Sequence, residues 1–305
     1  MNLALWAAGA TGVQVGAAIV ASRFAVAEVP PLTLAMLRYA LGFLCLLPFA
    51  WRTLAARPVS APRPPARDLV AMAALGIGQF GVLIALLNFG LQRVPAAQAA
   101  LIFSLFPLLT LALATALGRE QPTARLAGGV LLSIAGVACT LVPKLQAWQA
   151  IGWWGELAVL GAAATGALCS VLYRPYLQRY PVVPVSAFAM LASVLALALL
   201  ALPEAWPARV GGFSADAWGA IAFIGVSSGI GYFWWLYALK HLPPTRVTVF
   251  LALNPVTAAV LGWAFLGERP QAWTWFALGL IAAGLWLAAR GTDIAPRGTT
   301  DNPRP

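Results

Sequence analysis

The sequence predicts an all-α polytopic membrane protein whose ten transmembrane helices form two inverted five-helix repeats. Of its 305 residues, 61% are hydrophobic and only 9% are charged, a composition too apolar for a soluble domain of this length. Apolar stretches of about twenty residues recur along the chain, and each can cross a hydrocarbon core of roughly 30 Å. A repeat with a spacing of 148 residues, the separation of Pro107 and Pro255, relates the two halves.

Ten candidate spans follow one another, and most connections between them are short. The segments 57–68 and 203–216 are longer, and their polar residues and prolines cannot continue a helix. The first span lacks the basic n-region and clear cleavage site of a signal peptide, so we expect a membrane helix there. The tail 291–305 is predicted to be disordered and cytoplasmic. The predicted spans are 3–25, 31–51, 68–91, 95–116, 123–142, 152–173, 182–202, 216–239, 243–265 and 271–290.

The net charge of +10 does not predict a nucleic-acid partner, because the placement of the basic residues along the chain indicates how the protein is oriented in a membrane. If the N-terminus is cytoplasmic, most of the 19 lysines and arginines lie in segments on the cytoplasmic side, and Arg38 lies within a span. This asymmetry follows the positive-inside rule, so we expect both termini in the cytoplasm of a bacterial-type inner membrane. The basic residues placed outside are Arg23, Arg93, Lys144, Arg209 and Arg269.

The repeat is clearest around two prolines. LFPLLTLALATALGREQP (105–122) aligns with LNPVTAAVLGWAFLGERP (253–270), which places Pro107 on Pro255 and Glu120 on Glu268. Several helix breakers in one register are unlikely to coincide by chance, so we expect a first repeat over 1–146 and a second over 147–290. Further pairs in this register are Gly81 and Gly229, Pro95 and Pro243, Pro122 and Pro270, and Gly136 and Gly284.

A unit of five helices implies an inverted arrangement. Because five is odd, the second copy enters the membrane from the opposite face, and the two halves are related by an axis in the membrane plane. Inverted repeats with interrupted helices near the midplane recur in secondary transporters, where one half rocks against the other around a central site. The duplication therefore predicts a transporter.

These features resemble the EamA-type exporters of the drug/metabolite transporter superfamily. The similarity lies in the ten-span pattern, the proline in the fourth helix of each half, the GERP ending at 267–270 and the Arg38–Tyr39 pair in the second helix. Among these exporters the sequence looks most like YddG-like amino-acid exporters. The resemblance covers residues 3–290 and implies a ten-helix inverted-repeat fold that exports amino acids or other metabolites. The first copy departs from it, because Arg119 separates glycine from glutamate in GREQP.

Pro107 and Pro255 are candidate hinges. Each lacks an amide hydrogen and crowds the carbonyl four residues earlier, which loosens one helical turn within the membrane. Together with Gly81 and Gly229 they form the predicted gating set. The alternative is a static kink that only improves packing.

Polar side chains within the spans are candidate substrate contacts. At this depth such groups face the bundle or a wet cavity, where they either link helices or bind substrate. Arg38 either extends to the interface, pairs with Glu156 or neutralises a substrate carboxylate. Two deep tryptophans either pack or stack on an aromatic substrate. The candidate contacts are Gln14, Arg38, Gln79, Ser104, Tyr232, Trp235, Asn254 and Trp263.

The charges within the spans narrow the substrate class. Glu156 alone lies close to membrane depth, which disfavours a pump for cationic drugs built around a central acid. Phosphorylated substrates would require several inward-facing lysines or arginines, and Arg38 supplies only one positive charge. A neutral or zwitterionic metabolite, most of all an aromatic or other neutral amino acid, fits amides, hydroxyls and aromatic rings. A proton-coupled multidrug exporter is the alternative.

An enzyme is the competing class of function. The GVSSG motif at 225–229 matches G-x-S-x-G and would make Ser227 the nucleophile of an intramembrane serine hydrolase. His241 is the single histidine, and it follows Ser227 by about 21 Å along a helix. We therefore expect the motif to pack helices, and we expect no enzyme activity.

No cofactor or metal is predicted, because the three cysteines lack metal-type spacing. Likewise, no ring of like charges or repeated carbonyl filter predicts a channel. The expected partners are a small-molecule substrate and the lipid bilayer, and a monomer is sufficient for alternating access. The cysteines are Cys45, Cys139 and Cys169.

Overall fold

The protein is an all-helical membrane protein over the part of the chain that the computed structural model describes. Those residues are 3–56, 64–118, 124–146, 152–243, 247–248, 250–268 and 272–290, and no strand occurs among them. Within these described ranges, seven helical segments are long and apolar enough to cross a membrane. They are α1 (Leu3–Ala25), α2 (Pro31–Ala55), α3–η1–α4 (Ala66–Leu91), α5–α6 (Ala96–Ala116), α8 (Trp154–Arg179), α9 (Val182–Leu200) and α11 (Ala215–His241).

Helical residues also occupy the other three predicted spans. These are α7 (Ala124–Gln146), the short turn η4 (Phe250–Ala252) with α13 (Leu253–Leu266), and α14 (Ala272–Arg290). Between α9 and α11 the chain forms η2 (Leu202–Glu204), α10 (Trp206–Arg209) and η3 (Val210–Gly212). Several predictions fall outside the described residues, namely the disordered tail 291–305 and the repeat or loop residues Arg119, Glu120, Pro122 and Pro270.

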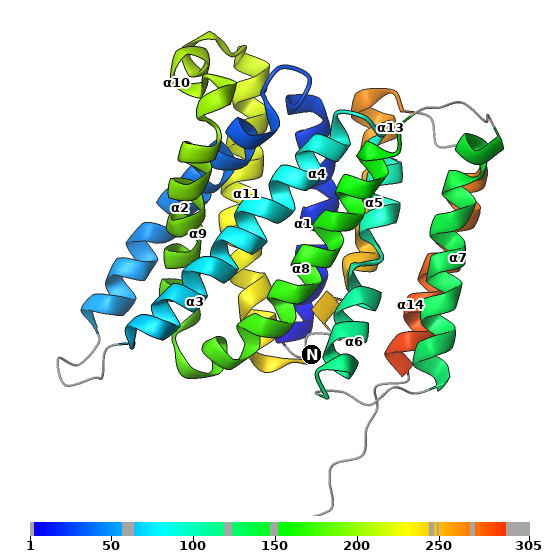
Figure 1. Ribbon diagram of the computed structural model, residues 1–305, viewed down its shortest axis with the longest axis horizontal. Helices are drawn as coiled ribbons and strands as arrows, with labels where there is room; N and C mark the ends of the chain where they lie inside the picture. Colours follow the sequence, from blue (N-terminus) through cyan, green and yellow to red (C-terminus); the bar gives the residue numbers. More distant parts are fainter. Residues whose placement is uncertain are drawn as a thin grey trace, which may run out of the picture.

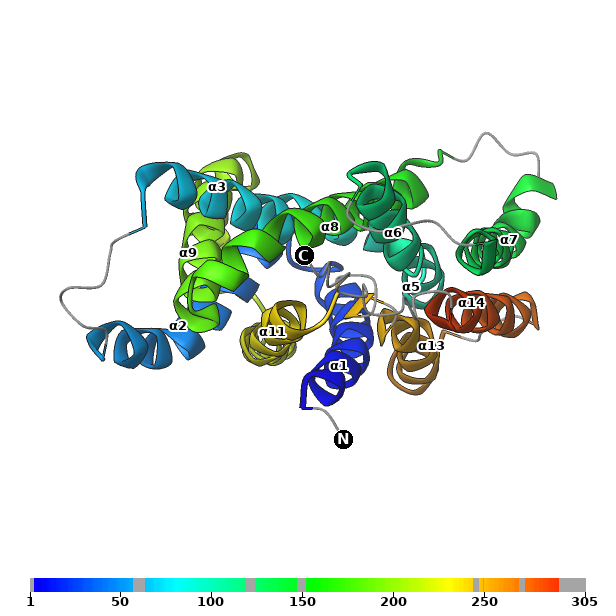
Figure 2. The ribbon, with the colours of Figure 1, turned by 90° about the horizontal axis from the view of Figure 1, so that it is seen from below.

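The bundle is elongated when seen along its helices (Figure 2). α7 and α14 pair with each other at one edge, and α2, α3 and α9 pack together near the other (Figures 1 and 2). In the middle, α1 packs against α11 and α13, while α8 packs against α4, α5 and α6. Helices from the two predicted repeats therefore contact each other at the centre of the molecule.

Carboxylates cap helices at the end of the bundle that carries α10, here called the α10 end (Figure 1). Glu204 accepts hydrogen bonds from the backbone amides of Leu32 (3.0 Å) and Thr33 (2.7 Å), in the first turn of α2. Glu28 accepts two 2.6 Å hydrogen bonds, from the amide and the hydroxyl of Ser214, the N-cap residue of α11. Amides in the first helical turn have no partner within the helix, so each carboxylate satisfies exposed donors and complements the helix dipole.

Glu268 makes the third such contact and joins α13 to two other helices. Its Oε2 accepts a 3.0 Å hydrogen bond from the amide of Ala96 at the start of α5, and its Oε1 lies 3.4 Å from Nε of Arg23 on α1. Arg23 also donates to the carbonyl of Leu91 (2.7 Å). The ends of α1, α4, α5 and α13 are thus tied together at the α10 end.

Two central spans are interrupted next to the candidate hinge prolines. Ser104 and Leu105 separate α5 from α6 (Phe106–Ala116), and Pro107 is the second residue of α6. In the other predicted repeat, η4 directly precedes α13, and Pro255 is the third residue of α13. A proline in a first turn removes an amide that would have no helical partner, so both prolines favour a new helix start.

The candidate gating glycines lie at close contacts between helices. A Cβ on Gly229 of α11 would lie 2.9 Å from the carbonyl oxygen of Gly42 on α2, so the two backbones approach closely there. A Cβ on Gly81 would lie 3.3 Å from Oγ of Ser193 on α9. Both positions serve helix packing in this conformation, and their role in gating stays a prediction.

Acidification is expected to weaken the contact between Glu28 and Ser214. The hydrogen bonds from the side chain and then the backbone of Ser214 lower the pKa of Glu28 from its ordinary 4.5. Because the folded-state pKa is depressed, this stabilisation is present above the ordinary pKa and is lost as the pH falls through the folded value. Between about pH 6 and about pH 3, we expect a smaller fall in unfolding temperature for Glu28→Gln than for the wild type, measured in detergent by tryptophan fluorescence. Identical pH dependence in both proteins would contradict the assignment.

Candidate functional site

A small cavity lies at the centre of the bundle, where helices of the two predicted repeats meet. Its volume is about 80 Å³, well below the roughly 300–1,000 Å³ typical of pockets for drug-sized ligands. Its walls come from α1, α2, η1, α4, α5, α6, α11 and η4. The lining residues are Thr11, Gln14, Val15, Ala18, Ile19, Arg38, Tyr39, Gln79, Phe80, Leu83, Ile84, Leu87, Phe103, Phe106, Ser228, Gly231, Tyr232, Trp235 and Leu251.

Interruptions of regular helix supply several of the lining side chains. Phe103 and Phe106 flank the break between α5 and α6, and Leu251 lies in the turn η4. Gln79 and Phe80 lie in η1 (Ile77–Val82), a π-helical turn between α3 (Ala66–Gly76) and α4 (Leu83–Leu91). A π-turn widens the helix locally and is often found at functional sites. The cavity therefore lies where backbone regularity is lost in three spans.

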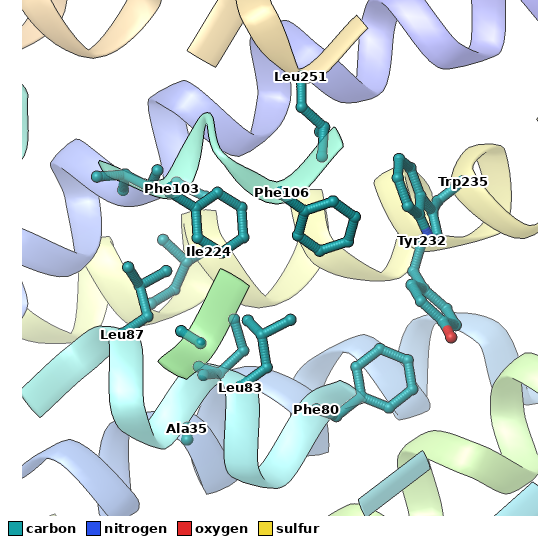
Figure 3. Packing of buried hydrophobic residues seen from close by; sticks show 14 of the residues in the cluster. Ala35, Phe80, Leu83, Leu87, Phe103, Phe106, Ile224, Tyr232, Trp235 and Leu251 are labelled. Atoms are coloured by element: carbon teal, nitrogen blue, oxygen red, sulfur yellow. The ribbon is translucent and has the colours of Figure 1, made fainter. Parts of the chain in front are cut away.

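Aromatic rings contribute to the cavity lining and are here called the aromatic wall; Figure 3 shows Phe80, Phe106, Tyr232 and Trp235 among the buried residues. The centroid of the Phe80 ring lies 4.1 Å from that of Tyr232 and 4.5 Å from that of Tyr39. The Phe106 ring meets Trp235 edge-on at 5.9 Å. Such edge-to-face contacts stabilise aromatic clusters and hold the rings in place.

Arg38 brings a positive charge to this otherwise largely apolar cavity. Its side chain is on α2 and is 5% exposed. Nε donates a 2.7 Å hydrogen bond to Oγ of Ser228 on α11, and Oγ in turn donates to the carbonyl of Ile224. Among the described residues, no carboxylate forms an ion pair with Arg38. The guanidinium thus contacts neutral groups, the hydroxyl of Ser228 and the ring of Tyr39, whose centroid lies 5.4 Å from Cζ, and no carboxylate among the described residues offsets its charge.

Two glutamines also contribute polar groups to the lining. Nε2 of Gln14 lies 3.3 Å from Oγ of Ser227, which links α1 to α11. Oε1 of Gln79 is buried and has no hydrogen-bond partner among the described residues. Since nearly all buried polar atoms are paired, an unpaired oxygen at a cavity is consistent with a position for a ligand donor.

The structure brings five of the predicted substrate contacts together and places three elsewhere. Gln14, Arg38, Gln79, Tyr232 and Trp235 line the cavity. Outside the lining, Ser104 is buried and its hydroxyl donates to the carbonyl of Leu101 (2.5 Å). Asn254 is fully buried, and neither atom of its amide has a partner among the described residues. Trp263 is 62% exposed on the surface of the bundle, away from the cavity.

Several lining residues were not predicted. Phe80 could have been proposed from its neighbour Gln79, since both lie between the closely spaced glycines of the IGQFGV segment. Thr11 lies about one helical turn before Gln14 and therefore on a neighbouring part of the same face. Phe106 directly precedes Pro107, and Ser228 lies in the GVSSG segment, but neither was predicted as a substrate contact, and their positions at the cavity depend on how the helices pack.

The lining that the structure describes contains no aspartate or glutamate. Glu156 is 6% exposed but lies in the first turn of α8 and is not a lining residue. Nε2 of Gln98 donates to its carboxylate (3.3 Å). This carboxylate is therefore not part of the cavity wall that the structure describes.

The GVSSG segment lies within the continuous helix α11 and has no strand–turn–helix elbow. Ser227 is hydrogen-bonded to Gln14, whereas His241 is exposed, with Nδ1 2.8 Å from the carbonyl of Tyr237. Gly225 packs against Leu41 of α2. The segment packs helices together and does not assemble a nucleophile with a base.

Comparison with known proteins identifies the family. The model of the EamA-like transporter family matches residues 2–142 and again 153–290, which together cover nearly the whole chain. The chain belongs to the EamA-like transporter family. It is therefore a membrane transporter of the drug/metabolite type and not an enzyme, and the family resemblance predicted from the sequence is confirmed.

Several relatives are described as transporters. A probable terminal-alkyne amino-acid exporter of Streptantibioticus cattleyicolor is 33% identical over 245 residues, covering 78% of this chain and 79% of that protein. The uncharacterized inner membrane transporter YedA of Escherichia coli K12 is 27% identical, covering 90% and 86%. A solved crystal structure that is 23% identical superposes with a TM-score of 0.66, covers 93% of this chain and 99% of the other, and supports the fold.

Gly166 is expected to be required for the packing of the cavity wall. A Cβ there would collide with the ring of Phe106 and lie 2.6 Å from Cδ1 of Leu83, and both of these side chains line the cavity. Overpacking of this kind costs about 1–3 kcal/mol, so Gly166→Ala should lower the unfolding temperature by several degrees. Gly161→Ala on the same helix is the matched control, because its Cβ would meet Leu86 at an ordinary 3.4 Å. Equal unfolding temperatures for the two variants in detergent would contradict this packing.

Proposed function

We propose that this transporter exports small neutral or zwitterionic metabolites, most of all amino acids, by alternating access. The observation that carries the proposal is the state of Arg38, whose buried cation borders the central cavity and pairs with no carboxylate among the described residues. Leaving a charge uncompensated in a low-dielectric site is costly, and a substrate carboxylate would offset that cost. The probable amino-acid exporter among the relatives supports this substrate class.

The architecture supports alternating access between two inverted repeats. The cavity lies between helices of residues 1–146 and helices of residues 147–290, as expected for a site at the interface of two repeats. The two successive family matches are consistent with a duplication of this kind. With both termini in the cytoplasm of the inner membrane, the α10 end faces outward, so the contacts of Glu28, Glu204 and Glu268 close the outer side.

The remaining predicted residues have roles in this scheme. Gln14, Gln79, Tyr232 and Trp235 contact substrate, and Pro107 and Pro255 let the interrupted spans bend where a new helix begins. Asn254 lies 148 residues after Phe106, a lining residue, so the repeat places it at the matching position of the other half. We propose that its unpartnered amide reaches substrate when the opposite side opens. Ser104 supports the break between α5 and α6, and Trp263 lies outside this contact set.

A proton-coupled multidrug exporter is the second candidate. It is favoured by one observation, the burial of Glu156 in the first turn of α8. In that case a buried carboxylate would exchange protons for cationic substrates. The acid-free lining among the described residues speaks against it.

Uptake into proteoliposomes containing the purified full-length protein tests the proposal. We expect saturable uptake of radiolabelled neutral amino acids and no transport of a cationic dye. Arg38→Met should reduce the initial uptake rate at least tenfold, since hydrogen bonds to charged groups contribute about 1.5–3 kcal/mol. Arg209→Met, which removes an exposed arginine on α10, is the control and should transport at the wild-type rate.

Two outcomes would overturn the proposal. Dye transport driven by a pH gradient, abolished in Glu156→Gln and without any amino-acid flux, would instead establish the multidrug exporter. Wild-type uptake in Arg38→Met would remove the observation on which the substrate class depends.

A further inference from the structure

We infer that the cavity is a two-point receptor for small aliphatic α-amino acids, in which Arg38 binds the carboxylate and Oε1 of Gln79 accepts the ammonium. This inference rests on the proposed function and adds the binding mode and the size class of the substrate. It follows from three properties of the lining, namely the orientation of Arg38, the unpaired amide of Gln79 and the space that the aromatic wall leaves.

The orientation of Arg38 suits a carboxylate. A guanidinium presents its donors in a planar fork, and the terminal nitrogens of the fork match the two oxygens of a carboxylate. In this structure Ser228 uses only Nε, at 2.7 Å, and this is the single hydrogen bond that Arg38 makes among the described residues. The side chain is therefore fixed at one nitrogen, while its remaining donors stay available at the edge of the cavity.

Gln79 supplies the opposite chemistry. Its Oε1 is a buried acceptor without a donor among the described residues, and its side chain lines the same cavity as Arg38. An ammonium group is a donor only, so it complements a lone amide oxygen. A neutral amide can accept a hydrogen bond from an ammonium group. A carboxylate in its place would also attract permanently cationic substrates.

The aromatic wall limits the size of the bound molecule. The cavity volume is only about 80 Å³, which favours a small amino acid such as alanine, serine or valine over phenylalanine or tryptophan. Phe106 and Trp235 close the wall by their edge-on contact at 5.9 Å, so a larger side chain requires the rings to move apart.

The two contacts can be separated with substrate analogues. The assay is competition against uptake of radiolabelled valine into proteoliposomes that contain the full-length protein. Valine methyl ester lacks the carboxylate charge, and N-acetylvaline lacks the ammonium. For the wild type, we expect each analogue to compete at least tenfold more weakly than valine, and phenylalanine to compete more weakly than valine.

The variants assign each contact to its residue. Arg38→Met should weaken competition by valine at least tenfold and should leave the weak competition by the methyl ester unchanged. Gln79→Leu should weaken competition by valine and leave competition by N-acetylvaline unchanged. The two compounds should then compete similarly. Arg209→Met is the control, and the thermal unfolding of every variant is measured so that loss of fold is distinguished from loss of binding.

The outcomes separate this inference from the proposed function. If the wild type takes up amino acids but the methyl ester competes as well as valine, or if tryptophan outcompetes valine, the receptor inferred here is wrong and the exporter proposal stands. If the wild type takes up no amino acid at all, the proposed function itself fails. The inference is supported if Arg38→Met no longer distinguishes valine from its methyl ester and Gln79→Leu no longer distinguishes valine from N-acetylvaline.

Discussion

The structure depends on the rule that a backbone hydrogen-bonding group cannot be left unpaired in hydrocarbon. Regular helices meet this rule by themselves, so interruptions are tolerated only where other helices shield them. The breaks beside Ser104 and η4, together with the π-turn η1, all contribute lining side chains to the central cavity. The same constraint that requires helices at the lipid-facing surface thus explains why the interruptions within these spans lie at the centre of the bundle, beside the cavity.

Much of the fold could be predicted because apolar length and helix-breaking residues act locally. The long apolar stretches predicted the helices. The prolines were predicted to loosen a turn within a span, and in the structure each lies in the first turn of a new helix. The cavity was predicted only in part. Gln79 and Arg38 are conspicuous because polar groups are rare at this depth, whereas Phe106 and Trp263 are ordinary apolar residues in sequence. Only the packing of α6 and α13 places the first at the cavity and the second on the exposed surface.

The two helices that pack closely through glycines, α2 and α11, are also the helices that hold the buried charge of Arg38. Gly42 and Gly229 let the backbones of α2 and α11 approach closely, and the same two helices carry Arg38 and Ser228. The 2.7 Å hydrogen bond between these side chains therefore spans a contact between the two predicted repeats. A displacement of α2 relative to α11 would change the position of the guanidinium, so in the proposed mechanism substrate binding at Arg38 is coupled to the relative position of the two predicted repeats.

The contacts at the α10 end differ in kind from those of the core, because they are separate polar contacts that water can reach. The side chains of Arg23 and Glu268 are 32% and 21% exposed, and the hydrogen bonds of Glu28 lie at the surface. When such contacts separate, each broken hydrogen bond is replaced by one to solvent, so the net free-energy change is small compared with that of exposing apolar surface. In the proposed transport cycle, contacts of this kind separate at little net free-energy cost, so the binding free energy of a single small molecule can shift the population between the two conformations.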